Sequence, residues 1–347
     1  MHCLGIKVMR LVADMREKRF RIVSLSLLFL FCFLPLCGCI LSTPDPLPSW
    51  NQGATKSDII GFVEEVTDPS NSSYILPEDR IAVFDNDGTL CCEQPEPVPI
   101  AFALHEIYTK AEENPSLRNK QPYKAVWEKD ENYFANLSEE ELGQQLILEP
   151  FSGMTQAEYL AIAKAYVEES KHPRFQVPYD RVVYKPMLEF MDYLRSKDFK
   201  VFIVSGGMAG LMRAYSEQVY GVPCENVIGI SAALEYVVQN ESSSLIRIEE
   251  FVEPISDFSG KAIDIQLRIG KRPILAVGNS DGDVEMLEFT DDREGPGLML
   301  LVHHDDTERE YQYDKGAEKI LEVAKNRNWT IVSMKNDFKT VFAFEQQ

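Results

Sequence analysis

Two carboxylates, Asp85 and Asp87, stand two residues apart, directly after a short apolar run and before Gly88 and Thr89. One carboxylate placed in this way could act as a nucleophile while its neighbour transfers protons. Carboxylate oxygens are also the ligands that a hard cation such as Mg²⁺ prefers. Because an Asx turn alone could explain the letters Asp-Asn-Asp-Gly, further motifs are needed to favour a catalytic site.

Two later segments supply such partners. Ser205 is followed by Gly206 and Gly207, so its hydroxyl and the amides after it could hold an anionic oxygen at a helix start. Lys261 lies upstream of a polar loop, residues 278–283, and could neutralise negative charge. Each motif has an ordinary alternative, since a Ser-Gly-Gly turn is common and most lysines are surface charges. Ser205 is not flanked by the Gly-x-Ser-x-Gly pattern of serine hydrolases.

The elements expected around these motifs place them at one edge of a sheet. Short apolar runs predict buried strands, and helical spacing recurs between them, which indicates a doubly wound parallel α/β sheet. The carboxyl ends of such strands gather where ligands bind. The expected strands cover residues 80–84, 199–205, 227–230, 273–277, 298–303 and 330–334, with an additional hairpin over 235–250.

Residues 91–181 have a different character. They are rich in charged residues, contain the capping-box pairs Ser138/Glu141 and Thr155/Glu158, and lack a convincing strand. We therefore expect a helical insertion here, between two parts of an α/β core at residues 55–90 and 182–347.

The three motifs, in this order, resemble those of the haloacid dehalogenase (HAD) superfamily, and the resemblance extends over most of the chain after the N-terminal segment. It implies a HAD-like, Rossmannoid core, with residues 91–181 as a helical cap similar to that of phosphoserine phosphatases. It also implies Mg²⁺-dependent hydrolysis of a small phosphorylated metabolite. The paired acids favour phosphatase chemistry, because HAD dehalogenases lack the second acid.

The resemblance implies a role for each matching residue. Asp85 would be the nucleophile that forms an aspartyl-phosphate, and Asp87 the general acid and base. Lys261 would neutralise the nucleophile and phosphate together, in preference to Lys271 and Arg272, which begin an incoming strand. The other expected contacts are Ser205, Gly206, Gly88 and Thr89 with phosphate, Glu93 with a cationic part of the substrate, and Asp85, the Asp87 carbonyl, Asn279 and Asp283 with the metal.

The loop from Gly278 to Asp283 departs from the commonest family pattern, because Asn279 stands where an Asp is usual. An amide oxygen can still bind Mg²⁺, but the loss of one charge should weaken the binding. Ser280 and Asp281 are further candidates at this loop. His303 and His304 end an expected strand and could reach the same edge, but we favour the simpler interpretation that they are a polar strand end.

Two alternatives to a hydrolase stay open. A phosphotransferase on the same fold would pass the phosphoryl group to an alcohol. A catalytically silent lipoprotein that only binds a phosphate ligand is suggested by Asn279 alone.

The charge of the chain excludes one class of partner. The formal charge is −20, and residues 1–38 contain six basic and two acidic residues, so the remainder has 29 basic against 53 acidic side chains, or −24. Such a surface repels a phosphate backbone, so a nucleic-acid partner is not expected. The sequence does not predict the oligomeric state.

The N-terminus has the order of a secretory signal: a basic stretch, an apolar run over 22–36 and small residues. The run has 15 residues, whereas a membrane-spanning helix needs about 20. Its ending, Leu36-Cys37-Gly38-Cys39, resembles a bacterial lipobox, which implies lipidation of Cys39. We therefore expect a signal peptide at 1–38, a lipidated tether at 39–54 and an exported protein anchored to a membrane of the cell envelope.

Overall fold

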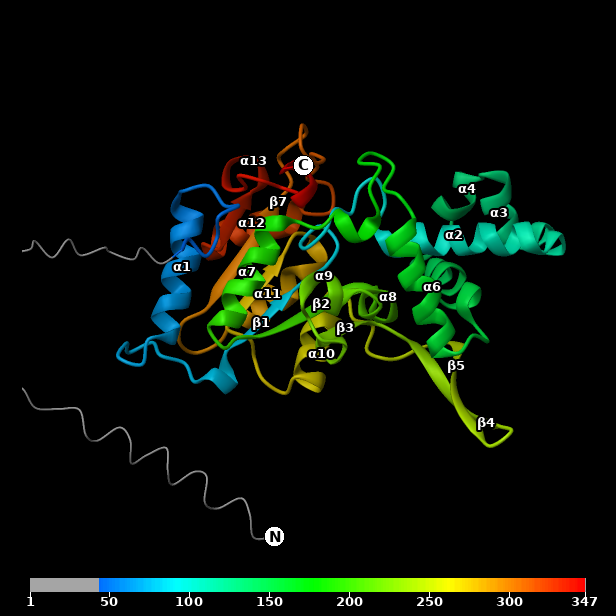
Figure 1. Cartoon of the computed structure of the whole chain (residues 1–347), viewed down its shortest axis with the longest axis horizontal. Helices are drawn as coiled ribbons and strands as arrows, with labels where there is room; N and C mark the ends of the chain where they lie inside the picture. The colour runs from blue at the N-terminus through cyan, green and yellow to red at the C-terminus, as the bar shows by residue number, and fades with distance from the viewer. Residues whose placement is uncertain (1–43, 347) are drawn as a thin grey trace, which may run out of the picture. The chain divides into compact units, whose positions relative to one another are not determined.

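The computed structural model describes residues 44–346, of which those from Asp45 onward form one compact unit. In this part of the chain, six strands form a parallel sheet in the order β3-β2-β1-β6-β7-β8 (Figure 1). The strands are β1 Ile81–Phe84, β2 Lys200–Met208, β3 Val227–Ile230, β6 Leu275–Gly278, β7 Leu298–His303 and β8 Thr330–Ser333.

Helices cover both faces of this sheet. Phe84 and Ile203 belong to a buried cluster that includes side chains of α1 and α7, whereas Val83 and Val204 point to the opposite face and join α10, α11 and α12. Alternate residues of each strand are thus buried against different helical layers, which explains why β1 is apolar throughout. The predicted α/β class with a doubly wound sheet is confirmed. The core helices are α1 Ala54–Thr67, α7 Lys185–Ser196, α8 Ala209–Arg213, α9 Ser216–Tyr220, α10 Ser259–Arg268, α11 Val284–Asp291, α12 Glu318–Arg327 and α13 Met334–Asp337.

One strand is longer than the sequence indicates. We expected β2 to end at Ser205 and a helix to follow the two glycines, but β2 continues to Met208 and α8 begins at Ala209. Met208 still pairs with Ile230 of β3, with a register shift after Ser205. Ser205 therefore lies within an irregular strand and not at a helix start.

The insertion between β1 and α7 consists of helices, as expected, and we call residues 91–181 the cap. A second element packs against it: a hairpin of β4 (Ala232–Gln239) and β5 (Ser242–Phe251). The turn of this hairpin is Asn240-Glu241, both with positive φ, and the three serines that follow lie in β5. Figure 1 shows the hairpin projecting beside the cap, below α6. The α-helices of the cap are α2 Val98–Glu113, α3 Tyr123–Glu128, α4 Glu131–Ala135, α5 Glu139–Leu142 and α6 Gln156–Glu169.

The segment before α1 is part of the folded core from Asp45 onward. Trp50 is buried, its ring lies 5.0 Å from that of Phe338, and its indole nitrogen donates to the carbonyl of Pro186 at 2.9 Å. The backbone and hydroxyl of Ser49 both donate to Glu189. Part of the expected tether at 39–54 is therefore packed into the core, because Leu47, Ser49 and Trp50 are buried.

The predicted signal peptide and Cys39 lie outside the described residues. Within residues 44–346, every helix is too short or too polar to cross a bilayer.

Candidate active site

The candidate site lies where four neighbouring strands approach their carboxyl ends. Asp85 follows β1, Ser205 lies in the last part of β2, Asn279 follows β6, and His304 follows β7. The amide of Asp85 still donates to the carbonyl of Val277 at 2.9 Å, so the start of this loop is held in the register of the sheet. The sheet topology thus brings together residues that are up to about 220 positions apart.

Lys261 is the electrostatic centre of the site. Its ammonium group lies 2.8 Å from Oδ1 of Asp85 and 2.6 Å from Oδ1 of Asp283, and all three side chains are buried. Burial disfavours the charged form of Lys261, but the two carboxylates outweigh this effect and raise its pKa. The position of Lys261 in the first turn of α10 agrees with the sequence prediction, whereas Lys271 is exposed and pairs with Asp79.

The two carboxylates on Lys261 differ in access. The Asp85 side chain keeps 7% of its area exposed and that of Asp283 keeps none. The second oxygen of Asp283 accepts the amides of Asn279 and Ser280 at 3.0 Å each. Both oxygens of Asp283 therefore fix Lys261 and the loop, Asp85 is the more exposed of the two acids, and the expected contact of Asp283 with a metal stays a prediction.

The protonation of the two catalytic candidates is shifted in the same direction. Burial raises the pKa of Asp85 well above its ordinary value, Lys261 opposes this rise, and Asp283 and Asp87 add to it. Burial and then the negative charge of Glu93 raise the pKa of Asp87 to about 7. Asp87 can thus hold or release a proton near neutral pH, which suits a residue that acts first as acid and then as base.

Ser205 and Asp87 meet beside Gly207. A Cβ atom added at Gly207 would lie 3.1 Å from Oδ2 of Asp87 and 3.4 Å from Oγ of Ser205, so a larger residue would crowd both groups. Gly206 faces the other way, since a Cβ there would lie 3.2 Å from the carboxyl carbon of Asp257. The backbone of these two glycines therefore lies between Asp87 and Asp257.

Gly88 and Thr89 build the loop instead of presenting amides to phosphate. The Gly88 amide donates to the carbonyl of Cys91 at 2.8 Å, and that of Thr89 to the carbonyl of Asn86 at 3.2 Å. The Thr89 hydroxyl is buried and donates to Oδ1 of Asn279 at 2.9 Å. Gly88 has φ +74° and packs against Asn279, which explains the glycine. These two residues position the catalytic loop, which corrects their expected role.

Glu93 lies beside the site but is already engaged. Its Oε1 accepts hydrogen bonds from the side-chain Nδ2 of Asn279 at 3.1 Å and from the hydroxyl of Tyr313. It also raises the pKa of Asp87 through its charge. Glu93 therefore lies where its charge favours the protonated form of Asp87, and its expected contact with a substrate cation stays a prediction.

His304 is a site residue whose role the sequence left undecided. It is buried, its Nε2 lies 2.9 Å from the carbonyl of Gly88, and its Nδ1 lies 3.2 Å from Oε2 of Glu310. The ring of Tyr313 stacks on it at 4.3 Å. Because a carbonyl can only accept, Nε2 must donate to Gly88. His304 is thus a positioning residue for the loop that carries Asp87.

The remaining candidates point elsewhere. His303 faces Asp314 at 2.8 Å on the surface. Asp281 accepts the amide of Ile320 in α12, and the Ser280 hydroxyl turns back to Asp283. The only sequence signal for His304 is its position at the end of a predicted strand. Nothing in the local sequence indicates its contacts with Glu310 and Tyr313.

The fit of the site to Mg²⁺ depends on its oxygen donors. Within residues 44–346, no group of three His, Cys, Asp or Glu side chains could hold a metal ion by itself. A cation would therefore depend on the Asp85 carboxylate together with the Asn279 amide oxygen and the Asp87 carbonyl, all of them oxygen donors. Without a cation, the raised pKa values of Asp85 and Asp87 favour their protonated forms, and a divalent cation would favour the ionised carboxylates. In donor type and charge, the residues fit.

A comparison with known families decides the classification. The model of the haloacid dehalogenase-like hydrolase family matches residues 82–288, which include all three motifs. The chain belongs to the HAD family. Its predicted membership is thereby confirmed, and Asp85, Ser205, Lys261 and Asp283 of this HAD protein all lie within the matched range.

Solved structures agree with the HAD fold. A conserved protein of unknown function from Anaerococcus prevotii DSM 20548 has a TM-score of 0.54 at 16% identity, covering 86% of this chain and 98% of its own. A phosphoserine phosphohydrolase-like protein from Francisella tularensis subsp. tularensis SCHU S4 has a TM-score of 0.40 at 13% identity, covering 73% and 94%. The first similarity supports the fold alone, and the second is too weak to support an inference. No curated protein sequence matches the chain.

Proposed function

We propose that this HAD protein is a phosphomonoester hydrolase that forms an aspartyl-phosphate on Asp85. The observation that supports this most directly is the ammonium group of Lys261 between Asp85 and Asp283, next to an Asp87 whose pKa is about 7. A nucleophile, a neutralising cation and an acid–base group thus converge at one edge of the sheet.

The reaction proceeds in two steps. An Asp85 oxygen attacks phosphorus, the bond from phosphorus to the ester oxygen breaks, and Asp87 gives its proton to the departing alkoxide. Asp87, now ionised, takes a proton from water as the water oxygen attacks the same phosphorus, and the bond from phosphorus to the Asp85 oxygen breaks. Inorganic phosphate leaves, and Asp85 and protonated Asp87 are regenerated.

Charge neutralisation is the main requirement of this chemistry, since both the carboxylate and the phosphate are anionic. Lys261 and the Ser205 hydroxyl supply part of it. Mg²⁺, held by Asp85, the Asp87 carbonyl and Asn279, would supply Lewis-acid neutralisation and orient the phosphoryl group.

The test is phosphate release by the purified protein from p-nitrophenyl phosphate and from glycerol phosphate, with Mg²⁺ or with EDTA. Acid-quenched wild-type protein should contain a hydroxylamine-sensitive phosphoryl group that Asp85→Asn lacks. If wild type releases no more phosphate than Asp85→Asn, the proposal is rejected. Excess alcohol in the assay separates a transferase, which would make a new ester in place of most of the inorganic phosphate.

We also propose that the protein is exported and anchored through a lipid on Cys39. The basic, apolar and small-residue order of residues 7–39 supports this. Expression in a bacterium fed with labelled palmitate should label wild type but not Cys39→Ser. Equal labelling of both proteins would contradict the anchor.

A further inference from the structure

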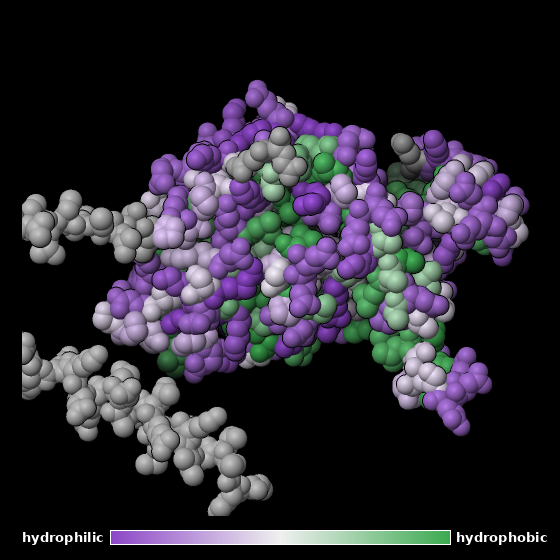
Figure 2. All heavy atoms as spheres, viewed as in Figure 1, coloured by the Kyte–Doolittle hydropathy of each residue, from purple (hydrophilic) through white to green (hydrophobic). Residues whose placement is uncertain are grey.

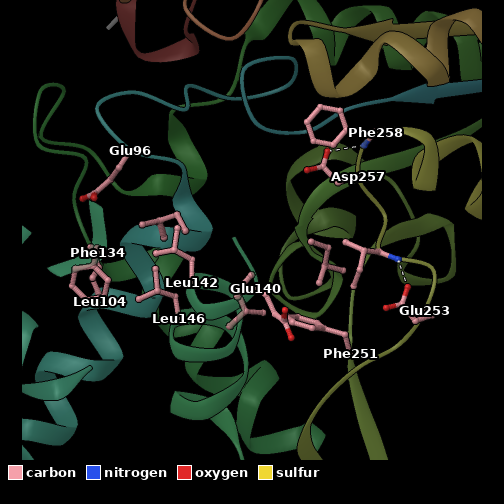
Figure 3. A pocket seen from close by; sticks show the side chains of 15 residues that line it. Glu96, Leu104, Phe134, Glu140, Leu142, Leu146, Phe251, Glu253, Asp257 and Phe258 are labelled. Atoms are coloured by element: carbon pink, nitrogen blue, oxygen red, sulfur yellow. Dashed lines mark hydrogen bonds between the residues drawn. The ribbon is translucent and has the colours of Figure 1, made fainter. Parts of the chain in front are cut away.

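A large apolar cavity lies between the cap and the segment that follows the hairpin. Its volume is about 1010 Å³, at the upper end of the range for small-molecule sites. Figure 3 shows that its walls come from two parts of the chain, with Leu104, Phe134 and Leu146 from the cap and Phe251 and Phe258 from the other side. In Figure 2, apolar side chains gather near the root of the hairpin.

One end of this cavity lies close to the acid–base group, beyond Gly206 and Gly207. Asp257 lines the cavity and packs against Gly206, while the adjacent Gly207 packs against Asp87. Gly207 also faces Pro99, whose neighbour Ile100 lines the cavity. Asp87 protonates the ester oxygen in the proposed reaction, so the organic group attached to that oxygen begins beside Gly207. The cavity, lined by Ile100 and Asp257, offers space for this group.

The charge of the lining restricts its occupant. Four carboxylates lie among the residues that form the cavity, Glu96, Glu140, Glu253 and Asp257, and none of those residues is basic. Glu96, Glu140 and Glu253 are solvent-exposed, so they place negative charge at the rim, around apolar walls. An anionic organic group would be repelled there, whereas an apolar group ending in a cation would satisfy both the walls and the rim.

We infer that this HAD protein acts on phosphomonoesters whose leaving group is a long apolar chain ending in a positive charge. This inference rests on the proposed phosphatase activity and deepens it. It differs from the small metabolite that the sequence suggests, because the volume of the cavity greatly exceeds what a phosphorylated amino acid would fill.

The test compares three esters with eight carbon atoms each, 8-aminooctyl phosphate, octyl phosphate and 7-carboxyheptyl phosphate, together with glycerol phosphate as a small ester. We expect kcat/KM to be highest for the amino ester, at least about tenfold above the carboxy ester at low salt, and to converge at high salt because the rim charges are exposed. Shortening the amino ester should lower kcat/KM by about two- to fourfold per methylene.

Two variants identify the cavity as the cause. Phe258→Ala should weaken the dependence on chain length, and the side chain is 50% exposed, so the fold should persist. Glu140→Gln with Glu253→Gln should reduce the preference for the amino ester. Leu267→Ala, at a 67% exposed side chain of α10 outside the cavity, and Glu322→Gln in α12 are matched controls that should change neither.

A measurement without turnover completes the design. Calorimetry should show binding of octylammonium but not of octanoate, and binding should weaken in the Phe258→Ala variant. If glycerol phosphate is hydrolysed but the three octyl esters react equally and octylammonium does not bind, this inference is overturned while the proposed function stands. If octylammonium binds and no ester is hydrolysed, the cavity assignment stands as a ligand site and the phosphatase proposal fails.

Discussion

The ammonium nitrogen of Lys261 lies 2.8 Å from Oδ1 of Asp85, and this contact joins the first helix turn of α10 to the end of β1. Because Asp283 shares the same ammonium group, removal of Lys261 would leave two buried carboxylates without their cation. The first prediction follows from this geometry.

Lys261→Met should lower the free energy of unfolding by roughly 3–5 kcal/mol, the usual cost of removing one partner of a buried ion pair. Urea denaturation monitored by circular dichroism measures this. Lys271→Met is the matched control, since Lys271 and Asp79 are both substantially exposed, and it should cost less than about 1 kcal/mol. Equal losses in the two variants would contradict the central role of Lys261.

Asp87→Asn should separate the two halves of the reaction. With p-nitrophenyl phosphate, whose leaving group needs no proton, Asp85 can still be phosphorylated, but the base that activates water is missing. We expect a burst of nitrophenolate close to one equivalent per enzyme, followed by turnover at least about a hundredfold slower than wild type. Rapid-mixing absorbance detects the burst, and linear progress without one would refute this division of labour.

The pH dependence should differ between leaving groups. Burial and Glu93 raise the pKa of Asp87 to about 7, so its acid form persists to neutral pH and is lost above it. For an alkyl phosphate, kcat should therefore fall as the pH rises from 7 to 9, whereas the first-step burst with p-nitrophenyl phosphate should not. An alkaline fall of the same size for both would indicate a different titrating group.

Asn279→Asp should make stability depend on Mg²⁺. The new carboxylate would replace an amide that donates to Glu93 at 3.1 Å, so two negative charges would face each other in a site with little solvent. In EDTA we expect a lower melting temperature than wild type, with recovery on adding Mg²⁺. Differential scanning calorimetry measures both, and a melting temperature unaffected by Mg²⁺ would argue against a cation at this position.

His304→Ala should lower kcat through the catalytic loop. The substitution removes the donor to the Gly88 carbonyl next to Asp87, and a small displacement of a catalytic group is costly, so we expect a fall of about ten- to a hundredfold. His303→Ala removes only a surface contact with Asp314 and should change kcat by less than about threefold. Partial recovery of the His304→Ala activity by added imidazole would distinguish repositioning from a general loss of structure.

Local patterns predicted the parts of this protein that local chemistry determines. The apolar run before Asp85, the Gly-Gly after Ser205 and the helix that begins near Lys261 each carry their own signal, and parallel topology then places them together. The extension of β2 to Met208 depends on pairing with β3, which the residues of β2 do not encode by themselves. The contacts of Asp283 could not be predicted from local sequence either, because they depend on the tertiary placement of Lys261.

Partners that are distant in sequence could not be found in this way. His304 bonds to Gly88 across 216 positions, and the Asp257 carboxylate meets Gly206 through a loop whose path follows from tertiary packing. The cavity is built from the cap and from residues 251–258, neither of which forms a binding pattern alone.

The hairpin changes how the cap is mechanically connected. Arg247 of β5 stacks on Tyr159 of α6 at 3.8 Å, and its backbone exchanges hydrogen bonds with Met154 and Gly153. A cap that is joined to its core by two linkers alone can undergo a large hinge rotation about them. Here the hairpin packs on the cap and its two ends connect to the sheet and to α10, so four chain segments link the cap to the core. The motion of the cap relative to the core should therefore be restricted. Cutting the hairpin at Asn240 should leave this restriction largely intact, whereas deleting the hairpin should remove it.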